Sequence, residues 1–324
     1  MSLPGRKPPI PAASGYPNYA SALNSPTFAQ GFTESFYPKT LAGNISTNSI
    51  KGVNLSQVGD EIIFRRRPEA EIFKYQKNQE LEISHLESST FSMVINRAWY
   101  YNLKLDEVDM SLVKDLPMFI KEFQASAQRK LAEVVDYEML TELPLQAHPC
   151  NKGRGAGVRS HMYDLGAKDA PVQLTHVNIV NYMVMMRQTL MEQNVDVSNM
   201  FIVLPVEAQT LFFAHPILAN ACASGLSKSI ILTETIPNIM GMTVYFSNLM
   251  PQYNEGGKTA YLILAGHKSA TGFVHKLTKN ETVKDSRTWG QLWRGLSIYD
   301  FKVLTPEALS VMYATIVHDP NARP

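Results

Sequence analysis

Cysteine and signal-like segments are scarce in this chain. Cys150 and Cys222 are the only cysteines in 324 residues, so no disulfide framework can form and a reducing cytoplasm is expected. The first residues, which include Pro4, Pro8 and Pro9, lack the apolar core of a secretory signal. The best apolar runs, 201–204 and 261–265, are strand-sized and far below the roughly 18 residues of a membrane-spanning helix. We therefore expect a soluble protein that stays inside the cell where it is made.

Charge is also in short supply. Charged side chains make up 18% of the sequence, whereas about 25% is usual for soluble proteins. The 30 basic and 29 acidic residues leave a net charge of +1, which argues against a dedicated nucleic-acid binder. Fewer charges mean less solvating surface, so we expect other copies or partners to cover much of it.

Known catalytic and cofactor motifs are missing as well. The glycine-rich run 152–157 fits neither the Walker spacing nor the dinucleotide spacing, and it is interpreted as a flexible basic loop. His148, Cys150 and His161 are too few for a zinc site, which usually takes four ligands in paired motifs. Cys222 has the surroundings of a small buried helix residue.

Nucleophile motifs are absent too, because the stretch 225–229 lacks the second glycine of G-x-S-x-G and the eight histidines form no H-E-x-x-H pair. Three further groups are interpreted as structural: the solvent-facing pairs Glu69/Glu71 and Glu80/Glu82, the run Arg65–Arg67 in ion pairs with neighbouring subunits, and the core or interface methionines Met183, Met185, Met186 and Met191. We therefore predict no catalytic, cofactor-binding or metal-binding residue and no cofactor.

The first fifty residues differ from the rest of the chain. They are rich in proline, serine, asparagine and glycine and show no helical or strand period, which indicates an extended arm. A free linker would gain nothing from six aromatic residues, whereas an arm across a neighbour could bury them: Tyr16, Tyr19, Phe28, Phe32, Phe36 and Tyr37. A docking arm is favoured over a linker, and deletion of about residues 1–45 is expected to leave a folded core but to impair assembly.

The next region, 58–105, has the pattern of strands. Runs 61–64, 79–84 and 91–95 are short and partly alternating, and Trp99, Tyr100 and Tyr101 are interpreted as extending the third. The region is charged and poor in core residues. It is therefore predicted to be a two-stranded excursion that needs support from something else.

A long helix is predicted over 117–142. Apolar residues recur there every three or four positions, Pro117 suits a helix start, Asp115 is a plausible cap, and Pro144 ends the pattern. At about 1.5 Å per residue it would be roughly 39 Å long, which is far above the usual helix length.

After a loop zone at 145–174, the remaining pattern alternates between helices and strands. Helices are expected at 176–193, 207–213 and 216–223, and strands at 200–205, 242–246, 259–264, 295–303 and 310–317. This order predicts an α+β fold.

The order of these parts resembles the major capsid proteins of tailed bacteriophages, which share the Hong Kong 97-type (Johnson) fold. The segments that carry the resemblance are Val58–Phe64, Phe91–Tyr100, Leu105–Asp109 before the long helix, Phe201–Pro205, Ile239–Ser247 and Tyr299–Leu309. The resemblance implies five stretches: an extended N-arm (1–52), an E-loop with the leading P-domain strand (53–106), a P-domain with the spine helix and glycine-rich loop (107–175), an A-domain (176–290) and C-terminal P-domain strands (291–324).

The same resemblance implies a non-enzymatic shell subunit. Hexamers and pentamers would form an icosahedral head that encloses double-stranded DNA without sequence-specific binding. Scaffolding, portal and decoration proteins would be partners, and the virion would assemble in the host cytoplasm. The E-loop would lie over an adjacent subunit. The first fifty residues are neither helical nor charged, which argues against a built-in scaffolding segment.

Two alternatives stay open. A cellular nanocompartment shell would have the same fold but would travel with a cargo enzyme instead of terminase, portal and scaffold proteins. A cytosolic α+β enzyme would need a cluster of polar residues converging in a pocket, which the sequence does not show.

Overall fold

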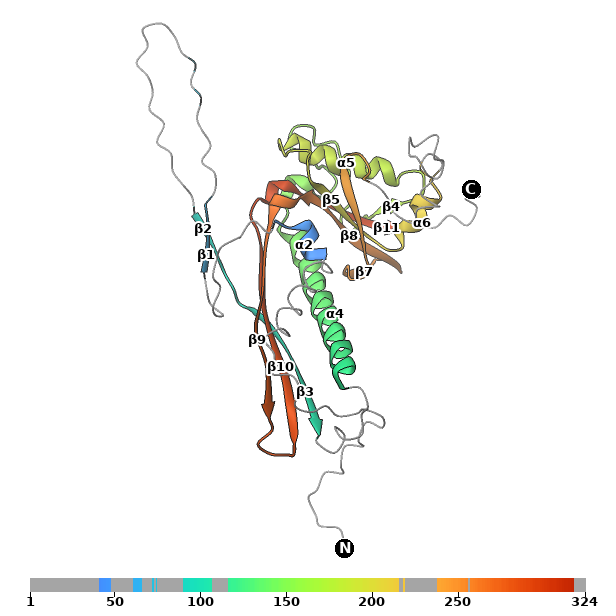
Figure 1. The fold of residues 1–324 in the computed structure, drawn as a ribbon. Coiled ribbons are helices and arrows are strands. Elements are labelled where there is room, and N and C mark those ends of the chain that lie inside the picture. Colours follow the sequence, from blue (N-terminus) through green and yellow to red (C-terminus); the bar gives the residue numbers. More distant parts are fainter. Residues whose placement is uncertain are drawn as a thin grey trace.

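The computed structural model describes residues 41–47, 61–65, 72, 74, 90–106, 116–215, 218, 238–255 and 257–317. A long helix and a three-stranded sheet run side by side, and a larger sheet with a covering helix lies at one end (Figure 1). The helices are α2 (Leu41–Ile45), α4 (Leu116–Glu142), α5 (Ile179–Glu192) and α6 (Ala208–Phe213). The strands are β1 (Glu61–Arg65), β2 (Thr90–Val94), β3 (Arg97–Asp106), β4 (Val172–Leu174), β5 (Met200–Pro205), β6 (Met242–Ser247), β7 (Gln252–Glu255), β8 (Lys258–His267), β9 (Thr271–Lys284), β10 (Gly290–Val303) and β11 (Leu309–Ile316).

Helix α4 confirms the predicted spine helix almost to the residue. Leu131, Val135 and Met139 follow one another at intervals of four and are all buried, so they form the stripe that joins the helix to the core. The helix ends where predicted, because Pro144 stands at the start of a 3-10 turn, η2 (Leu143–Gln146).

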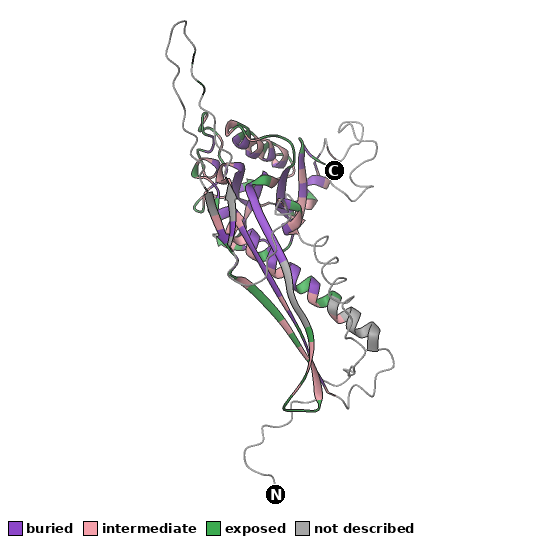
Figure 2. Ribbon diagram, turned by 60° about the vertical axis from the view of Figure 1, so that its left-hand side comes forward, coloured by how far each residue is buried: buried purple, intermediate pink, exposed green. Residues whose placement is uncertain are grey.

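The three-stranded sheet has β10 at its centre, with β3 and β9 antiparallel on either side. Exposed residues follow one another along β3 (Figure 2). The prediction that Trp99–Tyr101 extend the preceding strand is wrong, because β2 ends at Val94 and pairs with β1 in a separate sheet. Two contacts explain the break: Ile95 is buried in a small core, and the Asn96 amide donates to Asp300.

The six-stranded sheet has the order β4-β11-β8-β5-β6, with β7 paired to β8. Every residue of β5 is buried, which confirms the prediction of a central strand at 200–205. The predicted strands at 242–246, 259–264, 295–303 and 310–317 correspond to β6, β8, β10 and β11, and the helices at 176–193 and 207–213 to α5 and α6. The sequence patterns predicted neither β7 nor the fourteen-residue β9.

Part of the stretch predicted to be an extended arm belongs to the core. Ala42 and Ile45 of α2 are 0% and 1% exposed, and the Thr47 amide donates to the Thr271 carbonyl at 2.9 Å. The expectation that residues 1–45 contribute nothing to a folded core is therefore wrong for 41–45. The predicted strand at 79–84, the cap at Asp115 and the predicted helix at 216–223, apart from Leu218, lie outside the described residues. None of the helices described is both long and apolar enough to cross a membrane.

Gly295 in β10 leaves room for a contact between the three-stranded sheet and the spine helix. It pairs with Tyr101 across β3 and β10, and a Cβ at position 295 would collide with the Tyr101 ring. That ring packs edge-on against Phe123 of α4, with 5.9 Å between ring centroids. Burial of the Tyr101 ring raises the pKa of its hydroxyl to about 12.

We expect Gly295→Ala to destabilise the protein by about 1–2 kcal/mol, because the methyl group displaces Tyr101 from Phe123. Urea unfolding would measure the change. Gly155→Ala is the matched control, since its nearest neighbour would be 3.6 Å away, and it should be close to neutral. Equal effects of the two substitutions would contradict this role for Gly295.

Candidate functional site

Arg97, at the start of β3, is the centre of a charged cluster between the sheet and the spine helix. Its guanidinium donates to Glu138 at 2.8 Å and to both carboxylate oxygens of Glu142, at 2.7 and 2.6 Å. Asp300 of β10 lies 3.4 Å away, and the guanidinium stacks over the Phe301 ring at 4.4 Å from its centroid. The hydrogen bonds to Glu142 and Glu138 raise the pKa of Arg97 despite burial, so its charge is fixed.

Two aromatic side chains extend the cluster. The Tyr299 hydroxyl donates to Glu138 at 2.8 Å, and the Trp99 indole donates to the Tyr299 oxygen at 2.8 Å. Burial and the bond to Glu138 raise the pKa of Tyr299 well above its usual range, so Tyr299 stays neutral. All these groups hold α4 against β3 and β10, and none of them lines the hollow at the turn between β9 and β10. The arrangement is suited to mechanical coupling of helix and sheet.

Asp136 fastens helix α2 to the same helix. Its two carboxylate oxygens accept from the backbone amides of Leu41 and Ala42, at 3.0 and 2.9 Å. These amides open α2, so Asp136 caps a short helix that is distant in sequence. Burial raises the pKa of Asp136 to about 6, against the opposing effect of the two hydrogen bonds.

The pKa of Asp136 predicts a pH-dependent contribution to stability. Because the folded pKa of about 6 exceeds the unfolded value of 3.8, the folded state holds the proton more tightly, and stability falls by about 2–3 kcal/mol as the pH rises from 4 to 7. Asp136→Asn removes this titration and one of the two acceptors. We expect its thermal stability relative to wild type to be lowest near pH 4 and to recover toward pH 7; a constant difference would contradict the assignment.

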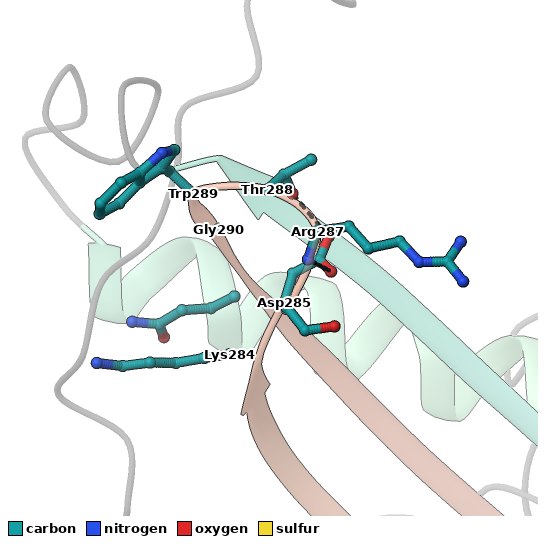
Figure 3. Close-up of a pocket in the computed structure, with 8 residues that line it drawn as sticks. Lys284, Asp285, Arg287, Thr288, Trp289 and Gly290 are labelled. Atoms are coloured by element: carbon teal, nitrogen blue, oxygen red, sulfur yellow. Dashed lines mark hydrogen bonds between the residues drawn. The ribbon is translucent and has the colours of Figure 1, made fainter.

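The turn between β9 and β10 lines a hollow of about 470 Å³. Asp285 holds this turn: it accepts from Lys104 at 2.5 Å, from the Thr288 hydroxyl at 2.6 Å and from the Arg287 amide at 2.9 Å. The bonds from Lys104 and Thr288 keep the pKa of Asp285 far below its usual range. Trp289 and Arg287 point to opposite sides of the turn (Figure 3), and Trp289 is 83% exposed. The turn therefore holds the exposed Trp289 side chain on a hydrogen-bonded loop. Its lining residues are not arranged as the acid and base of a catalytic site.

The glycine-rich loop is hydrogen-bonded, which corrects the prediction of a flexible loop. Ala156 and Tyr163 exchange two backbone hydrogen bonds, and the Gly157 amide donates to Cys150 at 2.8 Å. Glu192 of α5 accepts from the Arg159 amide at 2.9 Å. The loop therefore holds its shape largely through its own backbone hydrogen bonds.

The other residues considered as candidate site residues from the sequence lie in local hydrogen bonds, in the core or at the surface. His148 accepts from the Cys150 amide at 3.3 Å and so caps a 3-10 turn, while His161 is exposed in the loop. Met183 and Met186 are fully buried in the core, and Met191 is 45% exposed. Within the described ranges no group of three or more His, Cys, Asp or Glu could hold a metal ion. Arg65 ends β1; Cys222, 225–229 and the acidic pairs lie outside the described residues.

Comparison with known proteins gives matches in structure only. No family model matches the chain, and no curated protein matches it. The capsid of cyanophage P-SCSP1u aligns with a TM-score of 0.60 at 12% identity, over 81% of this chain and 85% of that one. A structure from Mycobacterium phage Che8 gives 0.59 at 16% identity, over 85% and 91%. The mature capsid of bacteriophage PhiM1 gives 0.58 at 12% identity, over 87% and 88%.

These matches cover most of both chains in each pair, so they concern the whole architecture and not one shared motif. At such low identity they establish the fold alone. The chain has the Hong Kong 97-type (Johnson) capsid fold, an α+β fold, as the resemblance in its sequence implied.

Proposed function

We propose that this protein is a major capsid protein of a tailed bacteriophage, which self-assembles into hexamers and pentamers of an icosahedral head around double-stranded DNA. The observation that carries the proposal is its fold likeness, over at least 81% of the chain, to two phage capsid subunits. Its role is structural and not enzymatic, and its place is the virion shell, assembled in the host cytoplasm.

The surface of the subunit supports this function. Tyr100, Met162 and Trp289 are 75%, 81% and 83% exposed, and they lie on β3, the glycine-rich loop and the hairpin turn. In a shell these side chains would be buried against neighbouring subunits, and their burial would favour assembly. The near-neutral net charge suits a container that does not hold its DNA tightly.

The division into N-arm (1–52), E-loop (53–106), P-domain (107–175 and 291–324) and A-domain (176–290) is part of the proposal. Self-association is its mechanism, and scaffolding, portal and decoration proteins are its further partners. Contacts in a ring of subunits are heterologous, so each subunit needs two different surfaces.

The test is assembly of the purified full-length protein. We expect closed shells, or hexameric and pentameric rings, in sedimentation velocity and negative-stain images at rising concentration, with and without a scaffolding protein. A single small oligomer under all these conditions would overturn the proposal. Shells that co-purify with an enzyme cargo, and never with packaged DNA, would favour a nanocompartment.

A further inference from the structure

A second hollow, of about 340 Å³, lies just beyond the end of the spine helix, on one face of the six-stranded sheet. Helix α5 covers the opposite face, since the Ser310 hydroxyl of β11 is hydrogen-bonded to the Thr189 hydroxyl of α5 at 3.1 Å. Side chains alternate between the two faces along a strand, so Val311 and Tyr313 point away from α5 and line the hollow. We call this hollow the Tyr313 pocket.

The walls of the Tyr313 pocket are mainly apolar. Tyr313 of β11 pairs with Leu262 of β8, and both side chains line the pocket. The ring of Tyr253, on β7, lies 5.9 Å from the Tyr313 ring, centroid to centroid. Leu145 of η2 also lines the pocket and is 63% exposed. Water in such a place finds few hydrogen-bond partners, so an apolar group that displaces it gains free energy.

The charged side chains of the pocket are both cations. Lys152 and Lys168 line it, and both come from the chain between α4 and β4. Neither makes an ion pair with any residue that the structure describes, and the Lys152 ammonium donates only to the Leu145 carbonyl, at 3.4 Å. An apolar wall beside two unpaired ammonium groups is complementary to a molecule with a hydrocarbon part and a negatively charged head.

The volume of the pocket sets the size of that molecule. Pockets that bind small molecules have volumes from about 300 Å³ upward, so this one is at the small end of the range. At about 30 Å³ for each water molecule in the liquid, it has room for roughly ten groups of the size of water or of a methylene. One medium-length hydrocarbon chain would therefore fill it.

We propose that the Tyr313 pocket binds a small amphiphilic carboxylate of the fatty-acid type. Its hydrocarbon chain lies against Tyr253, Leu262 and Tyr313, and its carboxylate lies beside the ammonium groups of Lys152 and Lys168. No sequence motif marks this site, because its walls come from segments that are far apart in the chain. The inference goes beyond the proposed function and does not depend on it, since all of these residues belong to one subunit.

Isothermal titration calorimetry of the unassembled full-length protein with sodium decanoate tests the site. We expect one molecule to bind per chain. Across the series hexanoate, octanoate and decanoate, the affinity should rise about fourfold for each added methylene and then level off at dodecanoate, because the pocket is full. Decyltrimethylammonium, which has the same chain and a positive head, should not bind. Equal binding of the two decyl compounds would overturn the proposal.

Filling the pocket with a side chain should block the ligand. Ala167 lines the pocket, whereas Ala170 exchanges two backbone hydrogen bonds with it in the same turn but does not line the pocket. Both alanines are half-exposed, so each can be enlarged without disturbing the core. Ala167→Phe should weaken decanoate binding about thirtyfold, and the matched control Ala170→Phe should leave it unchanged. Urea unfolding shows that both variants fold; equal affinities would contradict the location of the site.

Removal of charge tests the contact with the carboxylate. Lys152→Gln with Lys168→Gln should weaken decanoate binding about tenfold, since two ion pairs at the margin of the pocket are lost. Arg154→Gln with Arg159→Gln is the matched control, because these exposed cations belong to the same stretch of chain but do not line the pocket. The same loss in both double variants would mean that the net charge of the protein, and not this site, attracts the carboxylate.

The two proposals fail in different ways. Whether the protein forms rings or shells decides the proposed function and leaves decanoate binding untouched. If decanoate does not bind to the wild-type protein while Ala167→Phe impairs assembly, the pocket is a contact between copies of the chain, and only the assignment of a carboxylate site is wrong.

Discussion

Removal of residues 1–46 is expected to destabilise the fold severely, whereas removal of residues 1–36 should leave its stability unchanged. The longer deletion takes away α2, whose Ala42 and Ile45 are buried against the spine helix and β9. Burial of an isoleucine contributes about 2–3 kcal/mol, and a buried Asp136 carboxylate without its two amide donors costs about 1–3 kcal/mol more. The sum of about 3–6 kcal/mol is a large part of the whole stability of many domains.

The shorter deletion keeps the Leu41 and Ala42 amides and four residues before them, so Asp136 retains both donors. Urea unfolding of the two truncated proteins, beside the full chain, measures the difference. Both should assemble poorly, because the aromatic residues of the proposed arm lie within 1–37. Similar stability of the two truncations would show that α2 is not part of the folded core.

The sequence predicted those elements whose pattern is contained in a short stretch of chain. It did not predict those that depend on contacts between residues far apart in the sequence. Helix α4 was predictable because its buried stripe recurs every four residues, and β5 because all six of its residues are buried. In both cases a short window of sequence carries the pattern.

Strand β9 could not be predicted in this way. Its second half reads Thr-Lys-Asn-Glu-Thr-Val-Lys, which is polar and has no alternation, and it is a strand because β10 pairs with it along nearly its whole length. The break between β2 and β3 has the same origin, since the Asp300 carboxylate that binds the Asn96 amide is 204 residues away. Tertiary contacts override weak local patterns in both places.

The charged clusters could not be predicted from the sequence either, because their members are far apart along the chain. Arg97 lies 41 and 45 positions from its glutamate partners, and Asp136 lies 94 positions from Ala42. No motif links such residues. A weak signal does exist: Glu138 and Glu142 are four apart and therefore share one face of α4. Two like charges on a face that borders the core indicate that a cation must lie nearby.

The cluster around Arg97 shows how this fold couples its two long elements. The spine helix and the three-stranded sheet meet through Tyr101 and Phe123 at one level and through Arg97, Glu138 and Glu142 at another. The cation at position 97 serves three carboxylates, because Asp300 also lies within 3.4 Å. Removal of one side chain would therefore leave three acids without a positive partner.

We expect Arg97→Ala to destabilise the protein by about 2–3 kcal/mol, because Asp300 and Glu138 are only 11% and 23% exposed and lose their counter-charge. Arg294→Ala is the matched control in the same sheet. Arg294 pairs with Glu281 at 3.2 Å, but both side chains are nearly half exposed, so about 0.5 kcal/mol is expected. Urea unfolding at several pH values separates the two cases.

The pH dependence of the Arg97→Ala penalty is the sharper measurement. Burial already raises the pKa of Asp300, and loss of the nearby cation raises it further. The folded variant then binds protons more tightly than the unfolded chain does, so its stability relative to wild type should improve as the pH falls from 7 toward 4. The Arg294→Ala penalty should stay small throughout. A penalty for Arg97→Ala that is independent of pH would mean that lost packing over Phe301, and not unpaired charge, is the main effect.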